Sequence, residues 1–325
     1  MEFHIKILLL SFVVSTILGI IIIPILKLFK VGQIERSDGP ESHLKKQGTP
    51  TMGGIIIAAT VFIVCTFLYI QYSKKEITLA RNILPLLFVT IGFGLVGFID
   101  DFKKLVLKNT KGLKPLYKMI GLLIVAVIYT LFLTNVLKIG TDIYIPFIKE
   151  YINLPMWAYI PFAIFVLLGT TNAVNLTDGI DGLSTTVTTI ILTCLTVISI
   201  IFGVKEVTLV GSALVGACLG FLLFNLHPAK VFMGDTGSLL LGGAIAGISL
   251  YLKNPLILII IALIPIIETI SVMMQVAFFK KTGKRIFKMA PIHHHFELSG
   301  WSENKVVSVF SIITLTLCII GIYGV

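Results

Sequence analysis

Two long apolar runs of the chain are separated by the polar stretch Thr170-Thr171-Asn172-Ala173-Val174-Asn175-Leu176-Thr177-Asp178-Gly179-Ile180-Asp181-Gly182-Leu183. An ionised carboxylate in a hydrocarbon core costs roughly 2.5 to 3.5 kcal/mol, so Asp178 and Asp181 require water, a cation or a polar ligand nearby. Asn172 and Asn175 share one helix face, and the glycines after them allow the backbone to approach a ligand. The stretch therefore predicts a functional site at a helix end. The alternative is a solvated turn, because Asn and Asp also favour caps and turns.

The composition excludes a soluble globular protein. Hydrophobic residues make up 56% of the 325 residues, charged residues only 13%, and the mean hydropathy is +1.01, whereas soluble domains are roughly 45 to 50% apolar. The N-terminal apolar run, 7–29, is longer than the roughly 7 to 15 residues of a signal-peptide core, so it predicts a first membrane span. The net charge of +10 comes without a basic helix or an RNA-binding aromatic motif, so we expect no nucleic-acid partner.

Ten segments match the roughly 20 apolar residues that a spanning helix needs. They are 5–29, 53–72, 82–99, 118–137, 156–174, 183–203, 207–226, 237–252, 255–279 and 305–323. We therefore predict an all-α, polytopic protein of the lipid bilayer with about ten transmembrane helices, in which residues 1–325 form a single domain. The eighth segment is short and Gly-rich, and the topology after it would invert if it did not span. The loop 138–155 suggests a short hairpin.

Basic residues are divided unequally between the two sets of alternating loops. One set carries Lys30, Arg36, Lys45, Lys46, Lys103, Lys104, Lys108, Lys111, Lys114, Lys118, Lys230, Lys280, Lys281, Lys284, Arg285 and Lys288. The other set and the N-terminal tail carry Lys6, Lys74, Lys75, Arg81, Lys138, Lys149, Lys205 and Lys253. Since cytoplasmic loops are enriched in Lys and Arg, the first set predicts the cytoplasmic face and places both termini outside.

The unusual polar residues all fall on this basic face. They are Asp100 and Asp101 after the third span, the stretch 172–181 after the fifth, Asn225 and Asp235 after the seventh, and His293, His294 and His295 in the last long loop. Adjacent acids at a helix C-terminus oppose the macrodipole, but such a pair can divide the tasks of holding Mg²⁺ or a lysine and accepting a proton. The clusters together predict a cytoplasmic-face active site for a phosphorylated, metal-bound substrate.

Single clusters also have structural interpretations. Asp235 fits an ordinary helix N-cap, and the three histidines fit a solvated loop. Consecutive histidines do not easily converge on one zinc ion, so contact with phosphate is the functional reading that we favour for them. Glu268, in the middle of the ninth predicted span, is expected to face the bundle interior and to meet a hydrogen-bond donor that the sequence does not identify.

Several of these stretches together resemble one family. They are 46–54, 100–101, 172–183, 225, 232–237 and 291–297. Over nearly the whole chain they are similar to the phospho-N-acetylmuramoyl-pentapeptide transferase family, within the polyprenyl-phosphate N-acetylhexosamine-1-phosphate transferase superfamily. The muramoyl branch is indicated by Gly48-Thr49-Pro50-Thr51-Met52-Gly53-Gly54 and Pro291-Ile292-His293-His294-His295-Phe296-Glu297.

The resemblance implies transfer of phospho-MurNAc-pentapeptide from its UDP carrier to undecaprenyl phosphate, giving lipid I and UMP. It implies a multi-pass protein of the bacterial plasma (inner) membrane with its active site facing the cytoplasm. Mg²⁺ is expected at Asp235, with Asp178 beside it, and catalytic roles at Asp100, Asp101, Asp178 and His293. Substrate binding is expected at Lys46, Thr51, Asn172, Asn175, Asp181, Asn225, Phe232, His294 and His295. We expect Phe232 to stack on the uracil ring.

Several alternatives stay open at this point. A sister transferase would consume UDP-GlcNAc, a transporter would place its charges near the bilayer midplane, and an isoprenoid transferase would need a second aspartate-rich motif. Direct attack by the lipid phosphate and a two-step path through a carboxylate such as Asp235 are both compatible with the sequence. Whether the chain works as a homodimer is also open.

Overall fold

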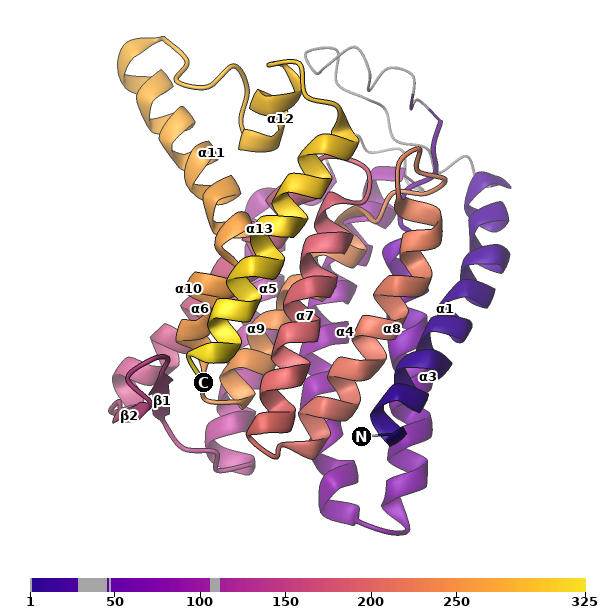
Figure 1. Cartoon of the computed structure of the whole chain (residues 1–325), viewed down its shortest axis with the longest axis vertical. Helices are drawn as coiled ribbons and strands as arrows, with labels where there is room; N and C mark the ends of the chain where they lie inside the picture. Colours follow the sequence, from indigo (N-terminus) through magenta and orange to yellow (C-terminus); the bar gives the residue numbers. More distant parts are fainter. Residues whose placement is uncertain (1, 29–45, 47, 106–111) are drawn as a thin grey trace.

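Long helices form most of the structure, a computed structural model that describes residues 2–28, 46, 48–105 and 112–325. The first helices are α1 (Glu2–Leu28), α3 (Gly54–Ser73), α4 (Ile77–Leu105) and α5 (Pro115–Leu131), which continues as the π-helical turn η1 (Phe132–Val136). They are followed by α6 (Met156–Thr177), α7 (Leu183–Ile201), α8 (Lys205–Asn225) and α9 (Gly234–Tyr251), all shown in Figure 1. Five residues counted toward the basic face lie outside the described ranges: Lys30, Arg36, Lys45, Lys108 and Lys111.

Nine helices of the described ranges are long and apolar enough to cross a membrane, which confirms the all-α, polytopic class. Helix α9, the eighth predicted span, is less apolar but still crosses the bundle. Its first turn meets the end of α4, where Asp101 accepts the Thr236 N–H, whereas Tyr251 at its other end donates to Glu206 at the start of α8. Residues 236–251 are all buried, so other helices and not lipid surround α9, and small residues suffice there. The topology after α9 is therefore not inverted.

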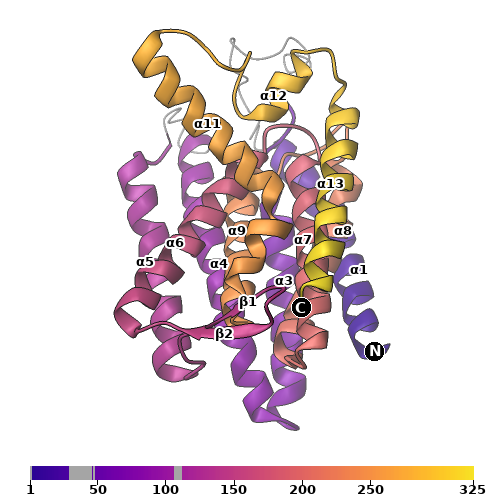
Figure 2. The same cartoon turned by 60° about the vertical axis from the view of Figure 1, so that its left-hand side comes forward.

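The ninth predicted span, 255–279, is not one continuous helix. It consists of η2 (Pro255–Ile257), α10 (Leu258–Ile261) and α11 (Leu263–Thr282), with an interruption at Ala262. Pro265 lacks the N–H that would bond to the carbonyl of Ile261, which explains the break. Figures 1 and 2 show that α11 leans away from the bundle at its far end. The spanning helix of this segment is Leu263–Thr282, so the predicted bounds are shifted by the interruption before Pro265.

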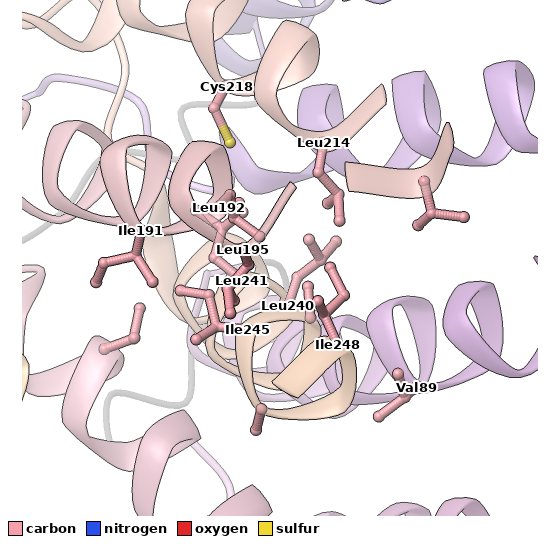
Figure 3. Packing of buried hydrophobic residues seen from close by; sticks show 14 of the residues in the cluster. Val89, Ile191, Leu192, Leu195, Leu214, Cys218, Leu240, Leu241, Ile245 and Ile248 are labelled. Carbon is pink, nitrogen blue, oxygen red and sulfur yellow. The ribbon is translucent and has the colours of Figure 1, made fainter. Parts of the chain in front are cut away.

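Lipid tails are as apolar as the surfaces of the helices, so the hydrophobic effect does not drive these helices together. Close side-chain packing holds the bundle together instead. Buried residues of α4, α7 and α8 pack against those of α9 (Figure 3). Helix α1 approaches α8 at Gly216 and Gly220, where added Cβ atoms would overlap α1. The hydroxyl of Ser15 donates across this contact to the Ala217 carbonyl at 2.7 Å. Because Ser11 likewise donates to Ala213, α1 runs parallel to α8.

The two described ends of the chain lie at the same end of the bundle (Figure 1). The predicted hairpin is present there as the antiparallel strands β1 (Asp142–Ile145) and β2 (Glu150–Asn153). The Phe147 N–H in the hairpin turn donates to the Gly324 carbonyl after α13 (Glu303–Tyr323). The short helix α12 (Ile292–Glu297) and the far end of α11 lie at the opposite end of the bundle (Figure 2).

Candidate active site

Asp101 fixes the beginning of α9 against the end of α4. Its carboxylate is 4% exposed and accepts the N–H groups of Asp235 at 3.2 Å and of Thr236 at 2.8 Å, together with the Thr236 hydroxyl at 2.6 Å. A carboxylate at a helix N-terminus satisfies free N–H groups and interacts favourably with the helix dipole. Asp101 therefore positions Asp235, whose backbone N–H it accepts.

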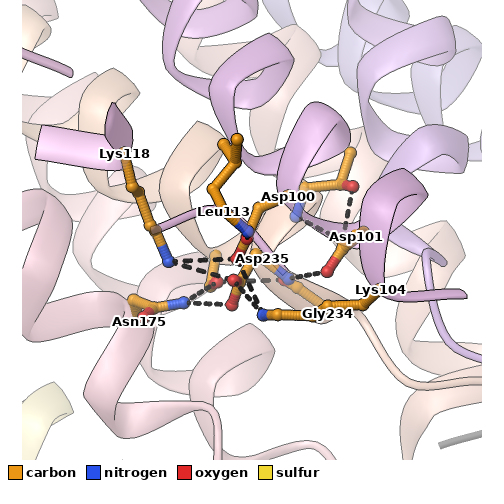
Figure 4. A network of polar contacts seen from close by, with 10 residues as sticks. Asp100, Asp101, Lys104, Leu113, Lys118, Asn175, Gly234 and Asp235 are labelled. Atoms are coloured by element: carbon orange, nitrogen blue, oxygen red, sulfur yellow. Dashed lines mark hydrogen bonds and ion pairs between the residues drawn. The ribbon is translucent and has the colours of Figure 1, made fainter. Parts of the chain in front are cut away.

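Asp235 lies at the centre of a network of charged groups (Figure 4). Its Oδ2 is 2.9 Å from the Nζ of Lys104 and 2.9 Å from the Nζ of Lys118. Asp100, which is 3% exposed, accepts the Leu113 N–H at 2.6 Å and lies 2.7 Å from the same Lys104 ammonium. The two lysines thus join Asp100 on α4 to Asp235 on α9.

The two asparagines of α6 make different contacts. Asn175 donates through Nδ2 to Asp235 Oδ1 at 2.9 Å and to the Ser238 hydroxyl at 2.8 Å. Asn172, one turn earlier, donates to the Leu168 carbonyl of its own helix at 2.7 Å. The structure therefore places Asn175 in the polar centre, while the Asn172 side chain bonds within α6.

Asp178 follows α6 directly and faces other carboxylates. Burial, and then the negative charges of Asp235, Asp101 and Asp181, raise the pKa of Asp178 to about 8, against the opposing effect of a hydrogen bond from the Gly234 N–H. We call Asp100, Asp101, Asp178 and Asp235, with Lys104, Lys118 and Asn175, the Asp235 cluster. Four carboxylates and two ammonium groups leave it with a negative balance, and carboxylate oxygens are the ligands that Mg²⁺ prefers. Asp178 and Asp235 therefore fit a divalent cation.

A second group of charges, the Lys46 cluster, consists of Lys46, Asp181, His227 and Glu303. The Lys46 ammonium is 2.8 Å from Asp181 Oδ1 and 2.6 Å from Glu303 Oε2, and His227 Nδ1 is 3.0 Å from Asp181 Oδ2. Burial acts to lower the pKa of Lys46, but the hydrogen bonds to Asp181 and Glu303 outweigh it and hold that pKa above its ordinary value.

The Lys46 cluster could also hold a metal ion. Ligand atoms of Asp181, His227 and Glu303 lie within 4.8 Å of one another, the one such group found in the described part of the chain. The Lys46 ammonium already neutralises part of the charge of these carboxylates, however, and one donor is an imidazole. For Mg²⁺, the all-oxygen pair Asp178 and Asp235 is the better fit, because this cation prefers oxygen ligands.

The loop between α8 and α9 joins the stretch before α3. Phe232 donates its N–H to the Pro50 carbonyl at 2.8 Å and accepts the Gly53 N–H at 2.8 Å, and its side chain is half-buried. Thr51 is buried, with its hydroxyl close to Gly234. Asn225 is 3% exposed and uses both ends of its amide, accepting from Thr185 at 2.7 Å and donating to the Val231 carbonyl at 3.0 Å. Asn225 therefore shapes this loop.

The three histidines of α12 have separate environments. His293 is 0% exposed and packs against Glu268 and Gly179. His294 Nδ1 is 2.8 Å from Glu297 Oε2, and His295 Nδ1 accepts the Lys288 N–H at 3.1 Å. Only His294 and His295 are partly exposed, so a direct contact of His293 with substrate does not agree with its burial.

Sequence reasoning did not assign site roles to four residues that the structure places in the two clusters. They are Lys104, Lys118, His227 and Glu303. Lys104 follows Asp100 by four residues, a spacing at which opposite charges meet on a helix, so this pair could have been found. Glu303 lies 122 positions from its backbone contact at Asp181, and no local pattern points to it.

Family models match the parts of the chain that carry these clusters. Residues 83–253, from α4 through α9, match the model described as glycosyl transferase family 4. Residues 46–57, which include Lys46 and Thr51, match the model described as phospho-N-acetylmuramoyl-pentapeptide-transferase signature 1. Fold and site thus define a polytopic membrane transferase of the glycosyl transferase family 4 class.

Individual relatives narrow this class. A phospho-N-acetylmuramoyl-pentapeptide-transferase from Acetivibrio thermocellus is 50% identical over 323 residues, which cover 99% of this chain and 95% of the relative. Proteins of the same name from Clostridium perfringens and Halalkalibacterium halodurans are 53% and 49% identical, over 96% and 97% of this chain and 95% of each relative. The chain belongs to the phospho-N-acetylmuramoyl-pentapeptide-transferase family.

Proposed function

We propose that this chain transfers phospho-MurNAc-pentapeptide from UDP-MurNAc-pentapeptide to undecaprenyl phosphate, forming lipid I and UMP in peptidoglycan synthesis. An oxygen of the lipid phosphate forms a bond to the phosphorus next to the sugar, and the bond from that phosphorus to the UMP oxygen breaks. The observation that carries the proposal is the family membership together with the charged Asp235 cluster at one end of the bundle. By the charge bias of its loops, this end faces the cytoplasm of a bacterial cell, and residues 1–325 act as one catalytic unit.

Mg²⁺ is the cofactor that we propose, held by Asp178 and Asp235. When bound, it supplies positive charge that stabilises the diphosphate and the UMP leaving group. Asn175 and Asp101 act on this pair indirectly, since Asn175 donates to the Asp235 carboxylate and Asp101 fixes the Asp235 backbone. The resulting geometry is preorganised, which is the main contribution a protein can make to phosphoryl transfer.

Lys104 and Lys118 are the groups that we assign to substrate phosphates. Their side chains are partly exposed, 36% and 20%, and both ammonium groups contact Asp235. Each ammonium has three donors, so it can contact a phosphate oxygen while it keeps a carboxylate contact. Asp100 holds Lys104 from the buried side and orients it toward the lipid phosphate. A strong base is not required, because a phosphate monoester with a second pKa of about 6 is largely ionised near neutral pH.

Direct attack by the lipid phosphate is the route that we favour over a covalent intermediate on Asp235. Both Asp235 oxygens already accept hydrogen bonds, Oδ1 from Asn175 and Oδ2 from Lys104 and Lys118. These contacts stabilise the carboxylate charge and so lower its nucleophilicity. Rapid quenching with labelled UDP-MurNAc-pentapeptide in the absence of lipid should therefore give no phosphorylated protein.

The uridine part of the donor is assigned to the Lys46 cluster and Phe232. The half-buried Phe232 ring offers a flat face for stacking with uracil, and Lys46 and Asp181 offer polar groups nearby. Thr51 and Asn172 complete our proposed set of substrate contacts, and His294 and His295 are assigned to phosphate or sugar groups. Asn225, with both amide ends engaged, acts through the loop that carries Phe232.

Detergent-solubilised protein tests the reaction and the sugar together. UMP release is measured with undecaprenyl phosphate and either UDP-MurNAc-pentapeptide or UDP-GlcNAc, with and without Mg²⁺. We expect Mg²⁺-dependent release from the first donor. Release from UDP-GlcNAc alone would assign the chain to a sister reaction, and release without undecaprenyl phosphate would overturn the proposed acceptor.

A further inference from the structure

Glu268 is a fully buried carboxylate in a helix of the membrane bundle. It lies six residues after the interruption at Ala262, in the part of α11 that packs along α6, and its exposed fraction is 0%. An isolated carboxylate at such a position costs several kcal/mol, so residues of this kind are paired and functional by default. The mechanism described above does not use Glu268.

The partner of Glu268 is His293 on α12. Glu268 Oε2 lies 3.1 Å from His293 Nδ1 and 3.5 Å from the His293 backbone nitrogen. The imidazole is also 0% exposed. Because both groups are removed from solvent, their contact fixes α12 to α11 and defines the orientation of the imidazole ring.

The opposite edge of the same imidazole contacts the turn between α6 and α7. A Cβ added to Gly179 would overlap His293 Nε2, although Gly179 does not adopt a positive φ and its backbone would accept alanine. Among the described residues, neither ring nitrogen has a hydrogen-bond partner, so Nδ1 meets Glu268 as a close charge contact at 3.1 Å and Nε2 meets only the turn. The ring therefore acts on the turn by close contact, and glycine is required at 179 because of the ring.

The turn that His293 contacts connects the two charged clusters. Asp178 precedes Gly179 and belongs to the Asp235 cluster, while Asp181 lies two residues after it and belongs to the Lys46 cluster. A displacement of this turn would move both carboxylates together. Misplacement by about 1 Å can lower catalysis by about 100-fold, so the position of the turn is important for turnover.

We propose that Glu268 and His293 form a positioning pair that holds the turn at Gly179 and so sets the positions of Asp178 and Asp181. The assignment rests on the proposed function and changes the expected role of His293, which acts through Gly179 and does not touch substrate. Glu268 orients the ring, the ring supports the turn, and the turn carries one residue of the cation site and one residue of the uridine site.

Two substitutions test the pair from opposite ends. Glu268→Gln removes the charge beside the ring, and Gly179→Ala keeps both side chains of the pair but forces the ring and the turn apart. For each we expect kcat to fall by about 10- to 100-fold, the half-saturating Mg²⁺ concentration to rise, and the calorimetric Kd of UMP to rise. The double variant Glu268→Gln with Gly179→Ala should lose less than the product of the two single losses, because both act on one turn.

Glu206→Gln is the matched control. Glu206 is a half-buried carboxylate in the first turn of α8 and accepts hydrogen bonds from Asn82 at 3.0 Å and Tyr251 at 2.7 Å, but it lies at the end of the bundle opposite the clusters. We expect it to lower the melting temperature in detergent and to leave half-saturating Mg²⁺ and UMP affinity unchanged. A purely structural role of Glu268 would give this same pattern and would overturn the proposal.

The outcomes for the pair and for the reaction are separable. If wild-type protein releases no UMP from UDP-MurNAc-pentapeptide, the proposed function fails. If wild-type is active and Gly179→Ala keeps wild-type kcat and UMP affinity, the positioning proposal fails, whether or not Glu268→Gln can be purified.

Discussion

The two charged clusters lie next to each other but balance their charges differently. In the Asp235 cluster, four carboxylates face the ammonium groups of Lys104 and Lys118, and Asp178 has a raised pKa because of its acidic neighbours. In the Lys46 cluster, Asp181 and Glu303 share one ammonium and one imidazole. The first arrangement favours an added cation, and the second favours a polar, uncharged group such as a nucleobase. The ratio of carboxylates to ammonium groups is two to one in both clusters, so the two tasks follow from how the groups are arranged and from the imidazole of the second cluster.

Removing a carboxylate from the Asp235 cluster should have the largest effect. We expect Asp235→Asn and Asp178→Asn each to lower kcat by about 100- to 1,000-fold, because each removes charge that is preorganised for the transition state. Melting temperatures in detergent at neutral pH should change little, since neither side chain belongs to the apolar core. Near wild-type turnover across a Mg²⁺ titration would remove the residue concerned from the cation site.

Changes at Phe232 should affect donor binding and not the cation. Base–aromatic stacking is worth roughly 1 to 3 kcal/mol, and about 1.4 kcal/mol corresponds to a tenfold change. Phe232→Ala should therefore raise the calorimetric Kd of UMP by roughly 5- to 150-fold, whereas Phe232→Trp keeps a flat face and should largely preserve it. Unchanged affinity in the alanine variant would contradict stacking, and equal losses in both would indicate packing.

The pH dependence of Mg²⁺ affinity should distinguish the two clusters further. With a pKa of about 8, Asp178 is protonated at neutral pH in the absence of a cation, and bound Mg²⁺ must displace that proton. The half-saturating Mg²⁺ concentration should thus fall roughly 25-fold as pH rises from about 6.5 to about 8.5. A flat profile in wild-type protein would contradict the assignment.

The raised pKa of Asp178 also makes the stability of the fold depend on pH. The folded-state pKa of Asp178 lies above the ordinary value of 3.8, so the neutral acid stabilises the fold at low pH, and this contribution is lost as pH rises toward about 8. Asp178→Asn should therefore gain melting temperature relative to wild-type protein as pH increases, in Mg²⁺-free detergent solution. A constant difference across that range would show that Asp178 does not titrate there.

Length and hydropathy predicted most of the spans, and they were less informative at two helices. Nine spans follow from length and hydropathy, but Pro265 interrupts the ninth predicted span, a local signal that a hydropathy window averages away. Helix α9 has lower hydropathy because its environment is other helices. Hydropathy measures compatibility with lipid, so it is least informative for the helix at the centre of the bundle.

For the site, the sequence pointed to several residues that the structure brings together, but not to what each one contacts. Asp101, Asn225 and His293 were expected to act on substrate, yet their contacts go to the α9 N-terminus, to the α8–α9 loop and to Glu268. The partner of Glu268 lies 25 positions away and is not visible in any local pattern. Residue types indicate chemistry, whereas partners depend on packing between distant segments.

The smallest expected effect concerns Glu303, the residue of the Lys46 cluster contributed by α13. Its carboxylate orients Lys46 at 2.6 Å and also accepts the Asp181 backbone N–H at 3.3 Å, but Asp181 remains as a second partner for the ammonium. Loss of one such contact is worth roughly 0.5 to 1.5 kcal/mol, so Glu303→Gln should weaken UMP binding by about 2- to 12-fold.

Half-saturating Mg²⁺ should stay unchanged in Glu303→Gln, because Glu303 is not part of the Asp235 cluster. Ser302→Ala, which removes only the cap that accepts the Lys305 N–H at 3.3 Å, controls for loosening of the start of α13. If Ser302→Ala and Glu303→Gln weaken UMP binding equally, the carboxylate has no specific role in the pocket; if Glu303→Gln shifts the Mg²⁺ requirement, the two clusters are not separate in function.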